Sequence, residues 1–321
     1  MNLRLFVHTV LTDSPQEAAA YLRAGALVAF PTETVYGLGA DAFNAEAVAA
    51  IYAAKGRPAD NPLIVHIAHF DQIALLADGL SENARTLIEH FFPGPITVIV
   101  KKKPEVPDVV TGGLDTVGVR MPRHAVARAF LEACGRPVAA PSANLSGRPS
   151  PTTWEAVYDD LDGRIACLLR GDRSETGLES TVVDCTGDIP VVLRAGVVPV
   201  EQLRVLLPEI ETINADAHEA ARSPGTRYRH YAPHAQVCLV HHPADADAHP
   251  DTAYIGLDVP ATPHAFGLTS RCENVDAYAH ALFDFFRRCD AAGIDRIYCQ
   301  TVAPAGLGRA LMDRLRRASH G

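Results

Sequence analysis

The chain has 321 residues, a length that suggests two domains, each able to bury its own core. The formal net charge of −9 argues against a protein that holds nucleic acid mainly by counterion release, although a local arginine cluster can still bind a small anion. No apolar run reaches the roughly 18 residues that a membrane helix needs, and the N-terminus has no small-residue cleavage site, so we expect a cytoplasmic protein without a membrane anchor.

The first 207 residues alternate helical and extended patterns. The clearest helix start has Ser14 as N-cap, Pro15 at the first position, Glu17 closing a capping box and Gly25 as the stop. Further helices are predicted over 44–56, 81–92, 124–135 and 200–207, and strands over 26–30, 62–67, 96–100, 116–120, 137–140, 164–170, 180–185 and 190–194. The glycine-rich stretch 37–46 is assigned to a turn. Strands outnumber helices, so the sheet must be mixed, with some antiparallel or edge strands.

Residues 208–234 lose the periodicity of a buried core and are predicted to be an interdomain linker. A linker is most simply a solvated connector. This one carries Arg222, Arg227 and Arg229 among Tyr228, His230 and Tyr231, which favours packing on something anionic. Residues 235–321 then alternate strands (236–241, 252–256, 294–300) with helices (275–293, 306–319), as in a small α/β domain.

The seven cysteines are scattered, their number is odd, and no CxxC pair occurs. Buried free thiols in a reducing compartment are the better interpretation. The fourteen histidines give no Cys/His pair with ligand spacing, so we predict no metal site made by side chains.

In four places a predicted strand or helix runs into a polar turn rich in Gly or Pro, and in open α/β sheets ligands bind at such ends. The turns are residues 30–39, 55–62, 120–124 and 140–150. In the last one, backbone N–H groups beside Gly147 can make an anion-binding nest, or the segment can be a serine-rich loop without a ligand. The residues alone leave these two possibilities even.

Lys55 is unusual, because the chain has four lysines against twenty-five arginines and the other three form the run 101–103. Lys55 can simply complement the negative end of a helix, but that role would suit arginine equally well. An ammonium two residues before the guanidinium of Arg57 suits a polyphosphate better.

Two other residues allow two interpretations. Arg120 ends a strand, where it can hold a carboxylate or form a surface salt bridge. His66 has apolar neighbours, and pattern alone favours a core histidine.

The chain lacks a Walker-type GxxxxGK[ST] loop and a GxSxG elbow, and the Gly-x-Gly at 37–39 lacks the third glycine of a dinucleotide fingerprint. The candidate residues bind charge and do not suggest a covalent catalyst. This favours a reaction run by positioning and electrostatics, such as nucleotidyl transfer.

Six motifs in order, PTETVYGLG, KGRPADNPL, TVGVRMP, APSANLSG, LESTVVD and VLRAG, resemble the threonylcarbamoyl-AMP synthase family with its YrdC-like domain. They cover about residues 10–205. SPGTRYRHYAPH is similar to the linker of the two-domain form, and the last helix to its C-terminal domain. The resemblance implies a YrdC-like domain over 1–207, a linker over 208–234 that covers the active site, and a small Rossmann-like α/β domain over 235–321.

The activity implied by the resemblance is synthesis of threonylcarbamoyl-AMP and pyrophosphate from L-threonine, bicarbonate and ATP with Mg²⁺. The product would pass to the tRNA threonylcarbamoyl transferase machinery that modifies adenosine 37 in tRNAs reading ANN codons. We expect a monomer with at most weak direct contact to tRNA.

The family pattern assigns residues to two substrates. It places threonine near Thr34, His66, Arg120, Ala140 and Ser180. It places ATP near Lys55, Arg57, Asn61, Thr116, Ser142, Asn144, Ser150, Arg194, Arg227, His230 and Tyr231, with Lys55 and Arg57 catalytic and the linker choice between Tyr228 and Tyr231 open.

Two other functions compete with the synthase. A carbamoyl-adenylate-forming maturation factor shares the Lys-x-Arg and Ser-x-Asn turns, but such proteins carry zinc-finger cysteine pairs that this chain lacks. A non-catalytic protein that binds double-stranded RNA or tRNA is disfavoured by the charge of −9.

Overall fold

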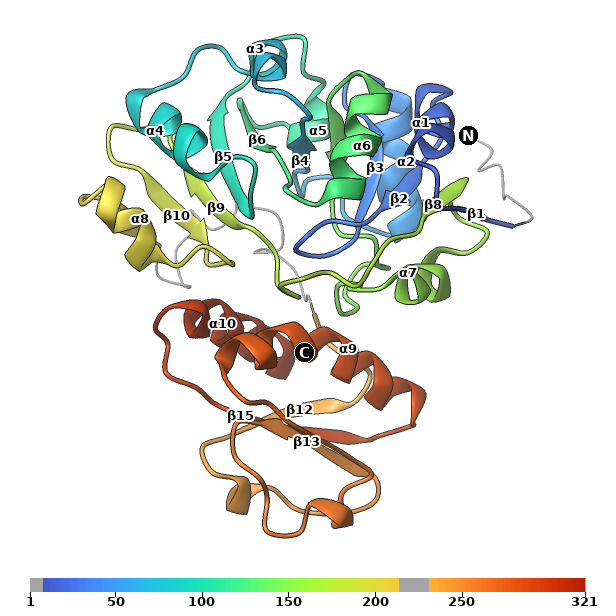
Figure 1. Cartoon of the computed structure of the whole chain (residues 1–321), viewed down its shortest axis with the longest axis vertical. Helices are drawn as coiled ribbons and strands as arrows, with labels where there is room; N and C mark the ends of the chain where they lie inside the picture. Colours follow the sequence, from blue (N-terminus) through green and yellow to red (C-terminus); the bar gives the residue numbers. More distant parts are fainter. Residues whose placement is uncertain (1–7, 214–230, 321) are drawn as a thin grey trace.

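The computed structural model describes residues 8–213 and 231–320. The prediction of a mixed α/β fold is confirmed: a large domain holds an eleven-stranded mixed sheet and a small domain holds a four-stranded sheet (Figure 1). In the large sheet the strand order is β1-β8-β2-β3-β7-β4-β6-β5-β9-β10-β11. The strands are β1 Val10–Thr12, β2 Val28–Phe30, β3 Gly37–Asp41, β4 Ile64–His66, β5 Ile96–Lys101, β6 Thr116–Arg120, β7 Val138–Ala140, β8 Cys167–Leu169, β9 Thr181–Asp184, β10 Val191–Arg194 and β11 Glu211–Thr212.

Helices flank this sheet and bury its aliphatic faces. They are α1 Pro15–Arg23, α2 Ala45–Lys55, α3 Ile73–Leu76, α4 Glu82–Phe91, α5 Asp108–Thr111, α6 Ala125–Cys134, α7 Trp154–Leu161 and α8 Val200–Leu206, with the short 3-10 turn η1 Phe70–Gln72 before α3. Helix α2 shows why the sequence pattern works. Asn44 accepts a hydrogen bond from the Ala47 N–H at the start, and Gly56 closes the end with a left-handed φ of 63°.

The prediction of a turn over 37–46 is wrong for its first half, which is strand β3. Glycine is needed there because β3 is squeezed between its neighbours. A Cβ added to Gly39 would lie 2.8 Å from Val138 Cγ1 and 3.1 Å from Phe30 Cε1. These glycines therefore mark close strand packing and not a loop.

The predicted capping box of α1 is also wrong in one half. Ser14 does accept from the Glu17 N–H, but the Glu17 carboxylate accepts from Thr12 Oγ1 at 2.6 Å. The Ser14 N–H also donates to Thr12 Oγ1, which takes the place expected for Glu17. Strand β1 and the helices α3, α5 and α7 were not predicted.

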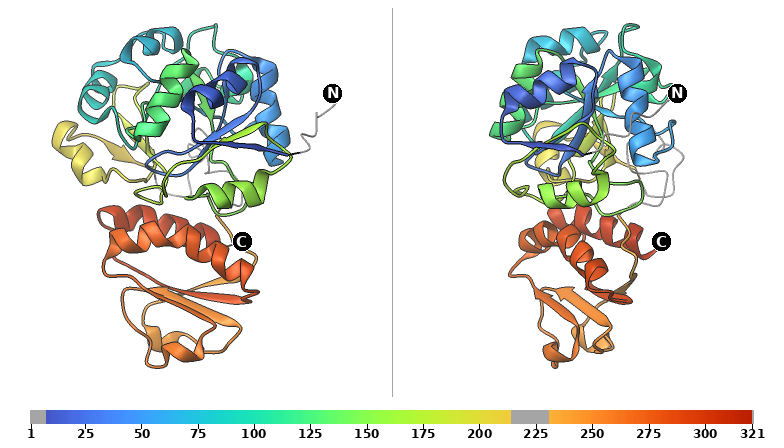
Figure 2. Two further views of the ribbon diagram at one scale, coloured as in Figure 1. Left: turned by 45° about the vertical axis from the view of Figure 1, so that its right-hand side comes forward. Right: turned by 90° about the vertical axis from the view of Figure 1, so that its right-hand side faces the viewer.

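The small domain has four parallel strands in the order β12-β15-β13-β14, of which β14 was not predicted. The strands are β12 Gln236–Val240, β13 Thr252–Gly256, β14 Leu268–Arg271 and β15 Arg296–Gln300; the helices are α9 Val275–Ala291 and α10 Leu307–Ser319, with 3-10 turns η3 Pro243–Asp245 and η4 Pro263–Ala265. Both helices lie between this sheet and the large domain, as the turned views also show (Figure 2).

One apolar cluster joins the two domains: Val35 and Leu178 of the large domain pack with Tyr231 and the core of α9 and α10. Strand β11 lies inside the range predicted as linker and extends the large sheet by pairing with β10.

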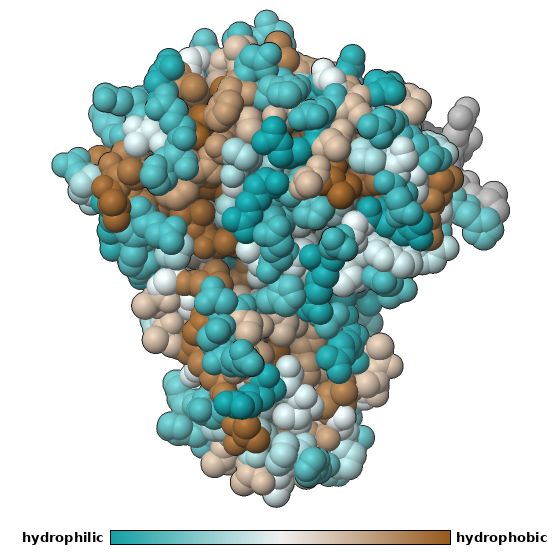
Figure 3. All heavy atoms as spheres, in the orientation of Figure 1, coloured by the Kyte–Doolittle hydropathy of each residue, from teal (hydrophilic) through white to brown (hydrophobic). Residues whose placement is uncertain are grey.

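Six of the seven cysteines are buried free thiols, as expected, and Cys238 is half-buried. Polar residues cover most of the face seen in Figure 3, with apolar residues scattered between them. In the described ranges, no helix combines the length and apolarity that crossing a membrane requires.

Candidate active site

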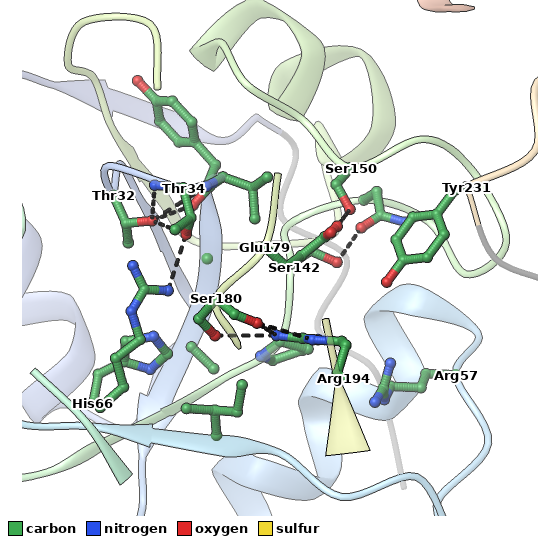
Figure 4. A pocket seen from close by; sticks show the side chains of 18 residues that line it. Thr32, Thr34, Arg57, His66, Ser142, Ser150, Glu179, Ser180, Arg194 and Tyr231 are labelled. Carbon is green, nitrogen blue, oxygen red and sulfur yellow. Dashed lines mark hydrogen bonds between the residues drawn. The ribbon is translucent and has the colours of Figure 1, made fainter. Parts of the chain in front are cut away.

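A cavity opens where the strand-end turns of the large domain meet (Figure 4). It is lined by Thr32, Thr34, Val35, Tyr36, Gly37, Arg57, Ile64, His66, Arg120, Ala140, Pro141, Ser142, Asn144, Ser150, Glu179, Ser180, Arg194 and Tyr231. Pairing within the sheet brings these residues together, because β4 lies between β6 and β7 with His66 opposite both Arg120 and Val138. All five residues assigned to threonine line this one cavity.

Arg120 forms a buried ion pair, so the alternative of a surface salt bridge is wrong. Its Nη2 lies 2.7 Å from Glu33 Oε1 and its Nη1 donates to Thr34 Oγ1 at 2.9 Å. A guanidinium has five N–H donors, and these two bonds leave others for a carboxylate in the cavity. Arg120 is thus fixed in direction by Glu33 and Thr34 while it faces the cavity.

Glu33 was not predicted to matter, yet its side chain is completely buried. Burial alone would raise the pKa of this carboxyl, but the charge and hydrogen bond of Arg120 outweigh burial and lower the pKa. Glu33 is therefore ionised at neutral pH and keeps Arg120 in a neutral pair.

His66 fits both of its interpretations. Its ring packs edge-on against Phe30, with the ring centroids 5.8 Å apart, and it also lines the cavity. Burial, assisted by the positive charge of Arg120, lowers the pKa of His66 to about 3. The imidazole is therefore neutral at physiological pH, so one ring nitrogen can donate a hydrogen bond and the other can accept one without adding charge.

The segment 142–150 is held in shape by its own polar groups. Ser142 Oγ donates to Asn144 Oδ1, and the Asn144 amide donates to the carbonyls of Leu145 and Arg148 at 2.8 and 2.9 Å. Gly147 takes a φ of 91°, which only glycine adopts at no steric cost. Ser142, Asn144 and Ser150 all line the cavity.

Lys55 lies behind this segment and does not line the cavity. Its Nζ donates to the carbonyl oxygens of Ser142, at 2.6 Å, and of Asn144. Only 2% of the residue is exposed, and burial, with the charge of Arg57 adding to it, brings the pKa of the ammonium well below its usual value. A compact ammonium fits between two carbonyls where a planar guanidinium would not, which accounts for the choice of lysine. Its direct contact with phosphate stays a prediction.

Arg57 and Arg194 place two more guanidinium groups on the cavity. Arg57 donates to the carbonyl of Pro62 at 3.1 Å, and burial lowers its pKa to about 10, so it remains charged at neutral pH. Arg194 donates through Nε and Nη2 to the Ser180 carbonyl at 3.1 and 2.9 Å. Both side chains face the cavity from different elements (Figure 4).

Besides Lys55, two more residues assigned to ATP lie apart from this cavity. Asn61 is buried beside Arg57, and within the described ranges its side-chain amide has no protein partner. Thr116 borders a separate small cavity together with Ile64, Thr97 and Gly118. Ile64 is common to both cavities.

Arg227, His230 and Tyr228 lie outside the described residues. Tyr231 does line the cavity, with a left-handed φ of 67° and 5% exposure. Its ring stacks on Phe283 of α9 at 5.4 Å, and the Arg314 guanidinium lies 5.2 Å from its centroid.

Glu179 is the acidic side chain of the cavity lining, and sequence reasoning did not single it out. Its oxygens accept from Ser150 Oγ at 2.6 Å and from Arg314 Nε at 2.8 Å. Burial would raise the pKa of Glu179, but Arg314 and Arg194 lower it. The signal was present in the LESTVVD motif, but its partner Arg314 lies 135 residues away.

The residues present do not form a cage for a metal ion. No group of three or more His, Cys, Asp or Glu side chains converges anywhere in residues 8–213 and 231–320. Glu179 is occupied by Ser150 and Arg314.

Comparison with known proteins places the chain in a family. Residues 20–196 match the Sua5/YciO/YrdC family model, described as telomere recombination, and residues 198–320 match the threonylcarbamoyl-AMP synthase C-terminal domain. The threonylcarbamoyl-AMP synthase of Pyrococcus abyssi is 44% identical over 94% of this chain and 93% of its own length; that of Bacillus subtilis is 43% identical over 97% and 94%. The crystal structure of P. abyssi Sua5 complexed with L-threonine superposes with a TM-score of 0.89, 41% identity and 97% of both chains covered. The chain therefore belongs to the threonylcarbamoyl-AMP synthase family, as its six motifs predicted.

Proposed function

We propose that the cavity makes threonylcarbamoyl-AMP and pyrophosphate from L-threonine, bicarbonate and ATP. One observation carries the assignment of the cavity: Arg57, Arg120 and Arg194 line it, while Glu179, its acidic residue, already accepts two hydrogen bonds. Such a cavity favours anions. A carboxylate, a bicarbonate and a polyphosphate are the anions that this reaction brings together.

Threonine is placed at the strand end of the cavity. Arg120 would take its carboxylate, since Glu33 and Thr34 fix the guanidinium but leave donors over. His66 and Ser180 lie within reach of the same end as neutral polar groups, and Ala140 forms an apolar wall. The P. abyssi relative solved with L-threonine supports this class of ligand.

ATP is placed against the segment 142–150 and the guanidinium groups of Arg57 and Arg194. Backbone and hydroxyl groups of this segment suit phosphate oxygens, and Lys55 brings positive charge up behind it. Asn61, Thr116, Arg227 and His230 stay predictions as nucleotide contacts. Mg²⁺ enters as part of the substrate, on the phosphates of ATP.

The chemistry needs no protein nucleophile. The threonine amine attacks bicarbonate and water leaves, which gives an N-carboxylate. A carboxylate oxygen of that group then attacks the α-phosphorus of ATP in line, and the bond to the β-phosphate oxygen breaks to release pyrophosphate. Arg57 and Arg194 would offset the charge that accumulates on the departing phosphates.

The product would serve the tRNA threonylcarbamoyl transferase machinery, because a mixed anhydride with AMP is an activated donor for an exocyclic amine. A cytoplasmic location, a monomeric state and weak tRNA contact stay predictions.

The test is release of pyrophosphate with each amino acid in turn, in the presence of ATP and bicarbonate. We expect release with threonine, and we expect it to require bicarbonate. Mass spectrometry should find the threonylcarbamoyl adenylate. If pyrophosphate were released with none of the amino acids, and the protein bound RNA in a salt-sensitive way, the protein would instead be a binding protein.

A further inference from the structure

Two largely buried arginines of the small domain support the segment 142–150 of the large domain. Arg287 comes from α9 and Arg314 from α10, the two helices that face the large domain (Figures 1 and 2). The Arg287 side chain is 13% exposed and that of Arg314 is fully buried. Each grips a buried carboxylate, which makes these contacts unlike ordinary surface ion pairs.

Arg287 contacts the middle of the segment, residues 145–149, partly through Asp160 of α7. Its Nη1 and Nη2 lie 3.1 and 2.9 Å from the two oxygens of that carboxylate, in a bidentate pair. The same carboxylate accepts from the Leu145 N–H at 3.1 Å and from Arg148 Nη1 at 2.7 Å. Nη2 of Arg287 also donates directly to the carbonyl of Pro149 at 2.6 Å.

Arg314 holds the end of the segment through Glu179. Its Nε donates to one oxygen of Glu179, whose other oxygen accepts from Ser150 Oγ. Its Nη2 donates to the Ala195 carbonyl at 3.0 Å, directly after Arg194 in the chain. One guanidinium therefore joins α10, the end of the segment and the strand that presents a cavity arginine.

We propose that Arg287 and Arg314 are positioning residues for nucleotide binding, which hold the segment 142–150 in shape through Asp160 and Glu179. The proposal rests on the assignment of this segment to ATP made above. It gives the small domain a part in substrate binding that is separate from carrying the linker. Neither arginine is among the residues that line the cavity.

Four variants of the full-length protein test this proposal. Arg287→Ala removes one brace and Arg314→Lys weakens the other while keeping its charge, since a lysine cannot reach Glu179 and Ala195 together. Arg173→Ala and Arg309→Ala are matched controls. Both residues cross the same interface, Arg173 to His280 and Asp284 and Arg309 to Glu201, without touching the segment.

The readouts are the dissociation constants of ATP and of L-threonine, measured separately by calorimetry, and the melting temperature. We expect Arg287→Ala to weaken ATP binding at least tenfold and threonine binding less than twofold. Arg314→Lys should weaken ATP binding several-fold, and both controls should stay within twofold for both ligands. An Arg287→Lys variant should recover part of the loss, because it restores one of the two bonds to Asp160.

A double-mutant cycle tests whether Arg287 affects ATP binding through Asp160. If Arg287 acts through Asp160, the double variant Arg287→Ala/Asp160→Asn should bind ATP no worse than the weaker of the two single variants. Fully additive losses would overturn the route through Asp160.

The proposal is overturned if Arg287→Ala binds ATP within twofold of the wild type. The proposal is also overturned if the variants at Arg287 and Arg314 weaken ATP and threonine binding equally, and in proportion to their loss of melting temperature. A wild-type protein that bound ATP but made no threonylcarbamoyl-AMP would refute the proposed function and leave this inference standing. A wild type that bound no nucleotide would refute both.

Discussion

The two ends of the cavity are built in different ways. The end proposed for threonine stands on neighbouring strands of the central sheet, where His66 and Arg120 are paired in register and Glu33 fixes the arginine from behind. The end proposed for the nucleotide is an irregular segment, residues 142–150, whose shape depends on groups from other elements: Lys55 from α2, Asp160 from α7 and Glu179 before β9. The first end is rigid by virtue of the sheet. The second is only as well ordered as the side chains that support it.

The difference predicts how each end fails. A change at the strand end should remove a ligand contact or unbalance a buried charge, and should have a large, local effect. A change among the residues that support the segment should leave its polar groups present but misplaced, so that ATP binding weakens by degrees.

The largest effect is expected from Arg120→Ala. It removes the group proposed to hold the threonine carboxylate and leaves Glu33 buried without its partner, a situation that costs about 3–5 kcal/mol of stability. We expect pyrophosphate release to fall at least a thousandfold and threonine binding to disappear. ATP binding by the part of the sample that remains folded should change little; an equal loss for both ligands would contradict the separation of the two ends. The double variant Arg120→Ala/Glu33→Gln is the control, and it should recover stability without recovering activity.

Lys55→Ala should have the next largest effect. The variant leaves the carbonyls of Ser142 and Asn144 without their shared donor, so the segment should lose its shape. We expect threonine- and bicarbonate-dependent ATP–pyrophosphate exchange to fall at least a hundredfold, with circular dichroism unchanged. Lys55→Arg should fail nearly as badly, because the site is buried and sized for an ammonium. A fully active Lys55→Arg variant would show that only charge matters at this position.

His66 should make the stability of the protein depend on pH. Its pKa is about 3 in the folded state and about 6.5 when unfolded, so the unfolded chain binds more protons between these values. The contribution is therefore complete above the unfolded pKa and declines as the pH falls towards 3. Between pH 7 and pH 5 the loss should be about 2 kcal/mol in the free energy of unfolding. Denaturant titration of the wild type against His66→Gln checks this, since the variant should show a flatter pH dependence.

Tyr231 should give the smallest effect of the four. Tyr231→Ala removes the ring that lies between Phe283 and the cavity, and we expect ATP binding to weaken about tenfold with little change in threonine binding. Tyr231→Phe keeps the ring stacked on Phe283 but removes the hydroxyl, so it distinguishes the contribution of the ring from that of the hydroxyl. Unchanged ATP affinity in Tyr231→Ala would exclude a role of the linker end in holding the nucleotide.

Sequence reasoning found the strand end more completely than the segment, and the reason is physical. The apolar runs of β6 and β7 stop at polar turns, so pattern alone placed Arg120 and the turn that starts at Ala140 at the ligand edge of the sheet. Their meeting point then followed from the sheet. Pattern alone favoured a core histidine for His66, and only the family resemblance placed it near threonine.

The support of the segment could not be found in this way. Asp160 lies in α7, a helix that was not predicted, and Arg287 and Arg314 lie over a hundred residues away on helices with an ordinary amphipathic pattern. No local pattern distinguishes an arginine that crosses a domain boundary from one that faces water. Lys55 was predicted to bind phosphate; the structure shows its Nζ on the carbonyls of Ser142 and Asn144, and its contact with phosphate stays a prediction.

The ion pair between Arg314 of α10 and Glu179 of the large domain also limits which changes the gene can tolerate. Glu179 is a buried carboxylate that relies on an arginine 135 residues later in the chain. A shortened gene that ended before the small domain would keep the acid and lose its counter-charge, so this truncation would be harmful unless position 179 changed in the same lineage. A chimera that combines the large domain of one relative with the small domain of another should likewise fold well only when it keeps both the acid at position 179 and the arginine at position 314. We expect positions 179 and 314 to be inherited together.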